Sequence, residues 1–174
     1  MKGGDEVIPA LNRVIAACEQ LGVPIYYTRD WHPSNHMSFK VRGGPWPPHC
    51  VQGTPGAEFH PGLRVPLGAI VISKGDDPDA EAYSAFQGTD LTKRLKNAGV
   101  DSVILGGLTA DYCVKESTLD ARNVGFTVEV LEDCTRAVNL KPGDGARALA
   151  VIRQAGARLI TASQVIKELA STQQ

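Results

Sequence analysis

The segment DSVILGGLTADYCVKESTLDARNVGFTVEVL, residues 101–131, decides the fold class. Its apolar run at 102–105 predicts a buried strand, and a helix is expected from about residue 112 to 124. Gly125 ends that helix, and residues 126–131 predict the next strand. Two strands joined by a helix pair in parallel within one sheet, because a parallel pair needs a long crossover connection.

The same alternation continues on both sides of this unit. It predicts α/β architecture: a parallel sheet with helices on both faces, in a single domain spanning residues 1–174. The stretch from 29 to about 67 is irregular, and a loop of this length in a compact domain is usually functional. The other expected helices are 5–21, 89–98, 143–155 and 163–170, and the other expected strands are 23–28, 68–73 and 158–161.

Composition excludes several classes of protein. The 174 residues include 18 basic and 19 acidic side chains, so the charge excess that binds nucleic acid or anionic membranes is absent. The longest apolar runs have the length of a strand and are too short to span a bilayer. No apolar signal region follows Lys2, so we expect a cytosolic protein. The sequence leaves open whether it is a monomer or a homo-oligomer.

Three of the four histidines lie between residues 32 and 49 of the long loop and suggest a metal site. Asp30 and His32 are alternate residues of an extended segment and therefore share a face, while His36 and His49 follow in the same loop. A carboxylate with imidazoles suits Zn²⁺, Mn²⁺ or Fe²⁺. The alternative is a set of surface histidines in a polar loop. His60 fits no cluster and is interpreted as a surface residue.

Cys113 is a candidate nucleophile because it falls in the first turn of the helix that follows strand 102–105. Free backbone N–H groups and the helix dipole favour a thiolate there, and the same N–H groups can bind an oxyanion. Asp111, a candidate N-cap, would oppose the thiolate. The alternative is that Cys113 is a small buried hydrophobic residue. Lys74 directly follows a buried strand, where it can stabilise a thiolate or be merely solvated.

The other three cysteines give weaker signals. The chain contains no CxxC pair, so a thiolate zinc site is not expected, and disulfides are not expected in a cytosolic protein. Cys18 faces the core side of the first helix and Cys134 follows a strand in an expected rim loop, and we interpret both as structural. The role of Cys50, next to His49, stays open.

Four motifs, in order along the whole chain, resemble the nicotinamidases of the isochorismatase-like cysteine hydrolase superfamily. The resemblance implies that superfamily's three-layer α/β/α fold and a small-molecule substrate, nicotinamide or an analogue. The motifs are TRDWHP at 28–33 with His36 and Ser38-Phe39, WPPHCV at 46–51 with GTPG at 53–56, Lys74-Gly75 with AYSAF at 82–86, and GLTADYCV at 107–114.

The resemblance also implies roles for individual residues. Cys113 would attack the carboxamide with electrostatic help from Lys74, and the backbone N–H groups of Thr109 and Cys113 would form the oxyanion hole. The peptide bond between Leu108 and Thr109 would be cis. One divalent metal ion, Zn, Mn or Fe, would bind the pyridine nitrogen. Its ligands would be Asp30, His32 and His49, with His36 a less certain addition, and the substrate ring would contact Trp46, Tyr83, Tyr112 and Leu108.

One family element has no match in this sequence. The family begins with a strand that ends in Asp-x-Gln-x-Asp-Phe and carries the general base, whereas Gly3–Pro9 resembles the segment downstream of it. We therefore expect a gap in the sheet and a catalytic pair in place of a triad. Either the chain as given is truncated or it is a variant with reduced or no amidase activity. The leading function is nicotinamide deamidation, and the alternatives are a related isochorismatase-like hydrolase or a non-catalytic metal- or nicotinamide-binding protein.

Overall fold

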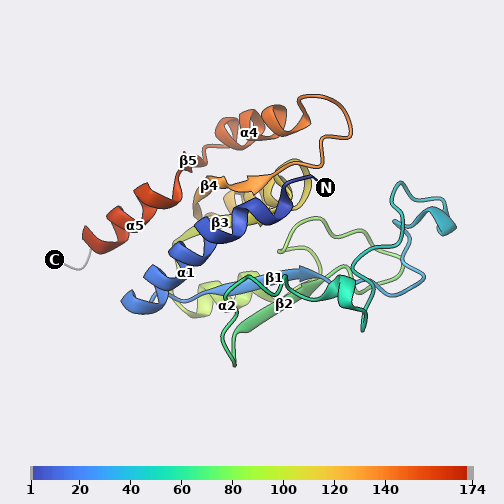
Figure 1. Cartoon of the computed structure of the whole chain (residues 1–174), viewed down its shortest axis with the longest axis horizontal. Helices are drawn as coiled ribbons and strands as arrows, with labels where there is room; N and C mark the ends of the chain where they lie inside the picture. Colours follow the sequence, from blue (N-terminus) through green and yellow to red (C-terminus); the bar gives the residue numbers. More distant parts are fainter. Residues whose placement is uncertain (1, 172–174) are drawn as a thin grey trace.

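The computed structural model describes residues 2–171 as two parallel sheets flanked by helices (Figure 1). The first sheet pairs β1 (Tyr26–Asp30) with β2 (Ile70–Lys74). The second has the order β3-β4-β5, formed by Ser102–Leu108, Thr127–Arg136 and Arg158–Ile160. Every ladder in both sheets is parallel, which confirms the predicted fold class.

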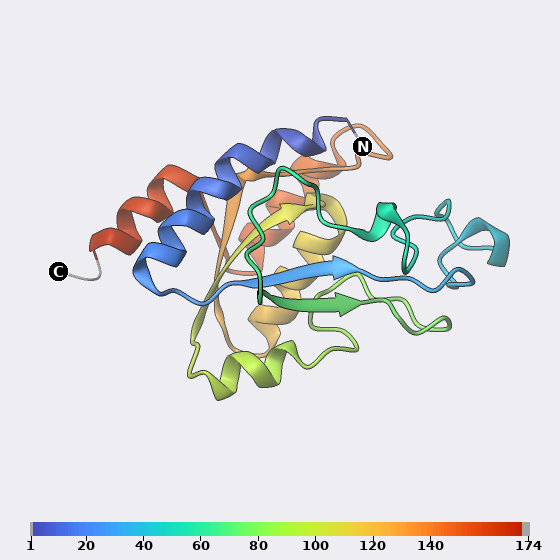
Figure 2. The same cartoon turned by 60° about the horizontal axis from the view of Figure 1, so that its bottom comes forward.

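Helices cover both faces of the strands. One hydrophobic cluster joins α1 and α5 to the strands, and the other joins α2, α3 and α4 to the opposite face. In Figure 2, α1 and α5 run together along the top of the molecule and α2 lies at the bottom. No helix among residues 2–171 is both long and apolar enough to cross a membrane. The helices are α1 (Ile8–Leu21), α2 (Leu91–Asn97), α3 (Lys115–Asn123), α4 (Asp144–Gln154) and α5 (Ala162–Ser171), with short 3₁₀ turns at Gly4–Val7, Lys40–Arg42 and Pro55–Ala57.

The two sheets belong to one layer that is interrupted between β1 and β3. Ile25 and Ile104 pack against the cluster of α1 and α5, whereas Tyr26 and Val103 pack against the cluster on the other face. Both sheets are therefore sandwiched by the same helices. Within residues 2–171, β1 bonds only to β2 and β3 bonds only to β4, so each has one unpaired edge. This is the gap that the sequence led us to expect.

The strand β4 differs most from its prediction. The apolar run ends at Leu131, but the strand continues to Arg136, so the expectation of a rim loop at Cys134 is wrong. The ladder to β3 shifts register between Leu105 and Gly107, and Gly107 then pairs with Thr135. Hydropathy missed the extension because four of the five added residues, all except Cys134, are polar or charged. Cys134 is fully buried in the α1 and α5 cluster, beside Cys18.

Candidate active site

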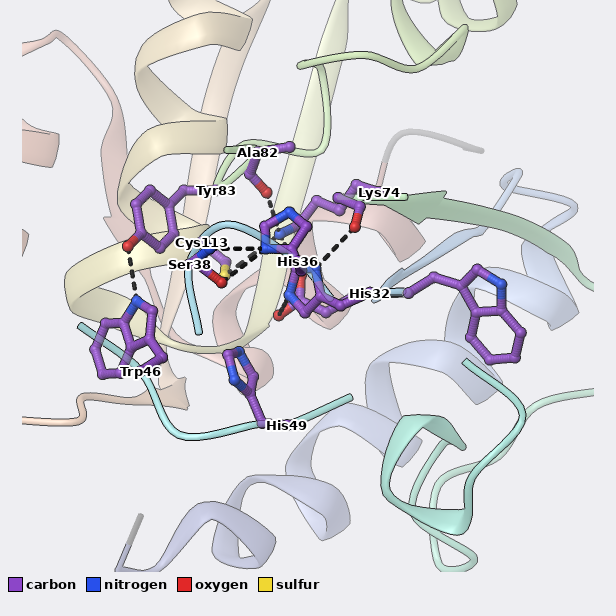
Figure 3. A network of polar contacts seen from close by, with 12 residues as sticks. His32, His36, Ser38, Trp46, His49, Lys74, Ala82, Tyr83 and Cys113 are labelled. Atoms are coloured by element: carbon purple, nitrogen blue, oxygen red, sulfur yellow. Dashed lines mark hydrogen bonds and ion pairs between the residues drawn. The ribbon is translucent and has the colours of Figure 1, made fainter. Parts of the chain in front are cut away.

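The carboxyl ends of the two sheets bring Lys74 and Cys113 together. Lys74 is the last residue of β2, and its ammonium group donates to a carboxylate oxygen of Asp30 at the end of β1. The same Nζ atom donates to the carbonyl of Ala82 at 2.8 Å and lies 3.6 Å from the Cys113 sulfur (Figure 3). Lys74 is 4% exposed, so water screens these charges little. Lys74 and Cys113, predicted to act together, are therefore in contact.

The two groups influence each other's protonation. Burial would lower the pKa of Lys74, but its interactions with the Cys113 sulfur and the Asp30 carboxylate outweigh burial and raise it, so the amine stays charged. Burial raises the pKa of the Cys113 thiol above its ordinary value, and the Lys74 charge opposes that rise. Near neutral pH the sulfur therefore rests mainly as a thiol, and Lys74 is the strongest of the influences that favour its ionisation.

Cys113 lies in a wide turn, Ala110–Val114, that precedes α3. The turn has π-helical geometry, and the N–H groups of Tyr112 and Val114 both donate to the carbonyl of Thr109. The Thr109 N–H interacts with the Cys113 sulfur and lowers its pKa. The peptide bond between Leu108 and Thr109 is cis, as predicted. Cys113 thus lies where a strand, a turn and a helix meet.

Asp30, His32 and His49 form a group with the geometry of a metal site. One ligand atom from each lies within 4.8 Å of the others. Nδ1 of His32 is 2.8 Å from the Gly75 carbonyl, and Nδ1 of His49 is 2.9 Å from the Pro47 carbonyl. Because a carbonyl only accepts, both Nδ1 atoms carry the proton and both Nε2 atoms keep a lone pair.

The protonation of His32 also suits a ligand. Burial lowers its pKa, so the imidazole is neutral near neutral pH, the form that binds a metal. A carboxylate with two neutral imidazoles is a donor set that fits Zn²⁺, Mn²⁺ or Fe²⁺. The residues present therefore fit the metal that the sequence predicted.

His36 lies outside this group, which corrects its expected role as an additional ligand. Its Nε2 atom is 3.0 Å from the Ala80 carbonyl and its Nδ1 atom is 2.7 Å from Oγ of Ser38. Both ring nitrogens are therefore engaged. The fully buried ring lies 4.3 Å from that of His32, centroid to centroid, and packs behind it. The sequence did not reveal that His36 packs against His32, because spacing alone does not show which way an imidazole points.

Three aromatic side chains form a wall beside the sulfur. Nε1 of Trp46 donates to the Tyr83 hydroxyl at 2.8 Å (Figure 3). The ring of Tyr112 lies 5.0 Å from that of Trp46 and 5.3 Å from that of Tyr83. Leu108, at the end of β3, has an exposed side chain. The structure thus brings together the three predicted ring-binding aromatics from three separate segments.

Two supporting residues were not recognised from the sequence as part of the site. Phe39 is fully buried, and its ring contacts those of His32, His36 and His49 at centroid distances of 5.7, 5.8 and 5.5 Å. Gly75 has a φ of 67°, and a Cβ there would lie 2.5 Å from the ring of His32. Both belong to motifs quoted above, but only the fold shows what they pack against.

Comparison with known proteins agrees with the fold and the motifs. A family model described as the isochorismatase domain matches residues 1–164. The chain belongs to the isochorismatase family. Among family members it is similar to the nicotinamidase of Escherichia coli K12, with 38% identity over 179 residues, 91% of this chain and 84% of that protein.

Solved structures give the same result. The pyrazinamidase of Pyrococcus horikoshii in complex with zinc is 46% identical with a TM-score of 0.87, covering 92% of this chain and 88% of that one. The PnC1 protein of L. infantum in complex with nicotinate is 37% identical with a TM-score of 0.82, covering 93% of this chain and 82% of that one. This isochorismatase-family chain is therefore similar to amide hydrolases over most of its length.

Proposed function

We propose that this protein is an amidohydrolase that converts nicotinamide to nicotinate and ammonia through a thioester on Cys113. The observation that carries the proposal is the contact of Lys74 with the Cys113 sulfur, next to the group formed by Asp30, His32 and His49. The similarity to nicotinamidases and to a nicotinate complex supports the choice of substrate.

In the first step the Cys113 sulfur bonds to the carboxamide carbon, and the thiol proton leaves with the departing nitrogen as ammonia. The Lys74 charge stabilises the sulfur as it ionises. The N–H groups of Thr109 and Cys113 are assigned to the developing oxyanion, where such donors typically contribute about 10²–10³-fold. Water then cleaves the thioester, which releases nicotinate and restores the thiol.

The substrate ring is assigned to the space between the aromatic wall and the histidines. Trp46, Tyr83 and Tyr112 would contact its faces and edges, with Leu108 at the rim. Asp30, His32 and His49 would hold one divalent ion, Zn, Mn or Fe. When bound, that ion supplies a Lewis-acidic site for the pyridine nitrogen. Holding the ring in this way would fix the carboxamide relative to Cys113.

A second candidate is a protein that binds metal and nicotinamide without turning the substrate over. The observation that favours it concerns the carboxylate beside Lys74. Within residues 2–171, Asp30 is the carboxylate that pairs with Lys74, and Asp30 also belongs to the metal group. A carboxylate engaged by a metal is a weaker base, so proton transfer from Cys113 would lack a dedicated acceptor.

The test is nicotinamide hydrolysis by the purified protein, followed by nicotinate and ammonia release. The protein is assayed as isolated, after chelation, and after separate addition of Zn²⁺, Mn²⁺ and Fe²⁺. The proposal expects equal amounts of both products and loss of turnover on chelation. Nicotinamide binding without ammonia release would favour the second candidate. Hydrolysis of other amides with no action on nicotinamide would instead point to a related isochorismatase-family hydrolase.

A further inference from the structure

The carboxylate of Asp111 is buried two residues before the nucleophile. Asp111 is 6% exposed and lies within the turn Ala110–Val114. The sequence suggested an N-cap, but its hydrogen bonds leave the turn and reach a different segment. A buried carboxylate destabilises a protein unless hydrogen bonds compensate its charge, so its partners indicate its role.

Both partners of Asp111 are backbone N–H groups of one short segment. Oδ1 accepts from Val138 at 2.9 Å and Oδ2 accepts from Asn139 at 2.8 Å. Asn139 has a φ of 54°, a left-handed conformation. Turns that include a left-handed residue can direct consecutive N–H groups at one anion. The carboxylate therefore joins the nucleophile turn to the segment 137–143, between β4 and α4.

That segment is itself fixed to the start of α4. Oδ1 of Asn139 accepts from the N–H of Gly145 at 2.9 Å. A Cβ on Gly145 would lie 2.7 Å from that of Ala137, so the helix and the segment are in direct contact. The connection from Asp111 through Asn139 to Gly145 therefore ends on a rigid element rather than on a free loop.

This connection adds a link to a distant segment to the turn's own backbone bonds. The N–H groups of Tyr112 and Val114 share the Thr109 carbonyl, and α3 begins without a side-chain cap from Val114. The Cys113 sulfur lies 3.6 Å from Nζ of Lys74, a contact that spans the gap between the two sheets. A displacement of 1 Å within the turn would lengthen this contact, and such displacements can cost about 10²-fold in rate.

We propose that Asp111 is a positioning residue, which holds Cys113 in register with Lys74 by tying the nucleophile turn to the segment 137–143. The inference rests on the proposed function for its effect on turnover. Its effect on the thiol itself does not depend on that function. Asp111 contributes by position and not by charge, because the Val138 and Asn139 N–H groups compensate its charge.

The test compares Asp111→Asn with Asp133→Asn. The asparagine at 111 keeps one acceptor but turns an NH₂ group toward the second N–H, so one bond is lost. Asp133 is a matched control, since its carboxylate also accepts from a backbone N–H, that of Ala162 at the start of α5, at 2.9 Å. We expect Asp111→Asn to lower kcat for nicotinamide about 10–100-fold, with KM and bound metal almost unchanged. Asp133→Asn should lower Tm by a comparable amount with kcat unchanged.

The rate of Cys113 alkylation by iodoacetamide at pH 7 gives a readout independent of turnover. If Asp111 acted only through its negative charge, it would disfavour the thiolate, and Asp111→Asn would speed alkylation. If Asp111 instead keeps Cys113 near Lys74, Asp111→Asn should slow alkylation. Faster alkylation, or equal kcat losses in the two variants, would overturn the proposal. If the unmodified protein does not hydrolyse nicotinamide, but Asp111→Asn still slows the alkylation of Cys113, the proposed function is refuted and the positioning role of Asp111 stands.

Asn139→Gly provides a second variant should Asp111→Asn fail to fold. Glycine keeps the left-handed φ and the N–H that Asp111 accepts, but removes the bond to Gly145. We expect slower alkylation and a smaller fall in kcat, with KM unchanged. A lower Tm with unchanged alkylation and unchanged kcat would refute the connection through the segment 137–143.

Discussion

The two sheets contribute different chemistry to the same site. The two-stranded sheet and its loops supply charged groups and candidate metal ligands: Asp30 and Lys74 from the strand ends, and His32 and His49 from the long loop. The three-stranded sheet supplies the turn with Cys113, whose neighbouring carboxylate, Asp111, is already compensated by backbone. The comparison teaches that the candidate metal ligands and the candidate nucleophile reside on separate units, which meet at the contact between Lys74 and Cys113.

The largest expected effect comes from Cys113→Ala on the three-stranded side. Removal of the nucleophile should reduce nicotinamide hydrolysis by about 10⁴-fold or more. Metal binding should be unchanged, because the sulfur lies outside the group formed by Asp30, His32 and His49. Ammonia release and metal content, measured on one preparation, check both statements.

Cys50→Ala is the matched control for that variant. Burial is the main cause that raises the pKa of the Cys50 thiol, to about 11, so it is a poor nucleophile near neutral pH. We expect Cys50→Ala to retain activity. Appreciable turnover by Cys113→Ala, together with an inactive Cys50→Ala, would contradict this assignment. The nucleophile would then be Cys50, which does not belong to the three-stranded sheet.

The converse variant on the two-stranded side is His49→Ala. Loss of one of three protein ligands should weaken metal binding by at least the roughly 10–100-fold typical of losing a ligand's supporting hydrogen bond. Alkylation of Cys113 should continue at a similar rate, because within residues 2–171 the imidazole of His49 bonds to the Pro47 carbonyl and not to the sulfur or to Lys74. His60→Ala is the control, since its imidazole accepts from the nearby N–H of Gly62 and does not belong to the group formed by Asp30, His32 and His49. Equal metal content in the two variants would contradict the ligand assignment.

Lys74→Met breaks the link between the two units. The Lys74 charge holds the pKa of Cys113 lower than burial alone would, so its removal should raise that pKa further. The fraction of thiolate at pH 7 then falls, and the pH dependence of alkylation moves to higher pH. Turnover should drop by about 10²–10³-fold, as for loss of one electrostatic stabiliser. Lys96→Met, on an exposed position of α2, is the control. An alkylation profile that does not move would show that Lys74 acts elsewhere.

Sequence reasoning succeeded where local pattern and tertiary contact agree. Alternating apolar runs and helices predicted the parallel architecture, because strand burial on both faces leaves a clear hydropathy signal. The spacing of Asp30 and His32 predicted a shared face, and the strand ends predicted where Lys74 and Cys113 would meet. These features follow from the periodicity of apolar residues and from the order of strands and helices, both of which can be read from a single sequence.

The remaining features depend on contacts that a sequence does not specify. His36 turns to Ser38 and Ala80 because of how the loop folds back, and nothing in its spacing distinguishes it from His49. Asp111 resembled an N-cap because acidic residues favour helix starts, but the segment 137–143 offered it two N–H groups. In both cases the orientation of the side chain depends on a hydrogen bond to a segment distant in the sequence, which spacing alone does not show.

The smallest predicted effect concerns the boundary between the two sheets and is measured by hydrogen exchange. β4 is paired on both sides, whereas β1 and β3 are each paired on one. Consecutive residues of a parallel strand direct their N–H groups to opposite edges, so alternate amides of β1 and β3 point into the gap. These should exchange at least about tenfold faster than those of β4, the ratio that corresponds to roughly 1.4 kcal/mol of local stability. Native exchange of the intact protein, resolved by residue, provides the measurement. Slow exchange along both edges would mean that a segment outside residues 2–171 or a second copy covers them, and the two sheets would then act as one.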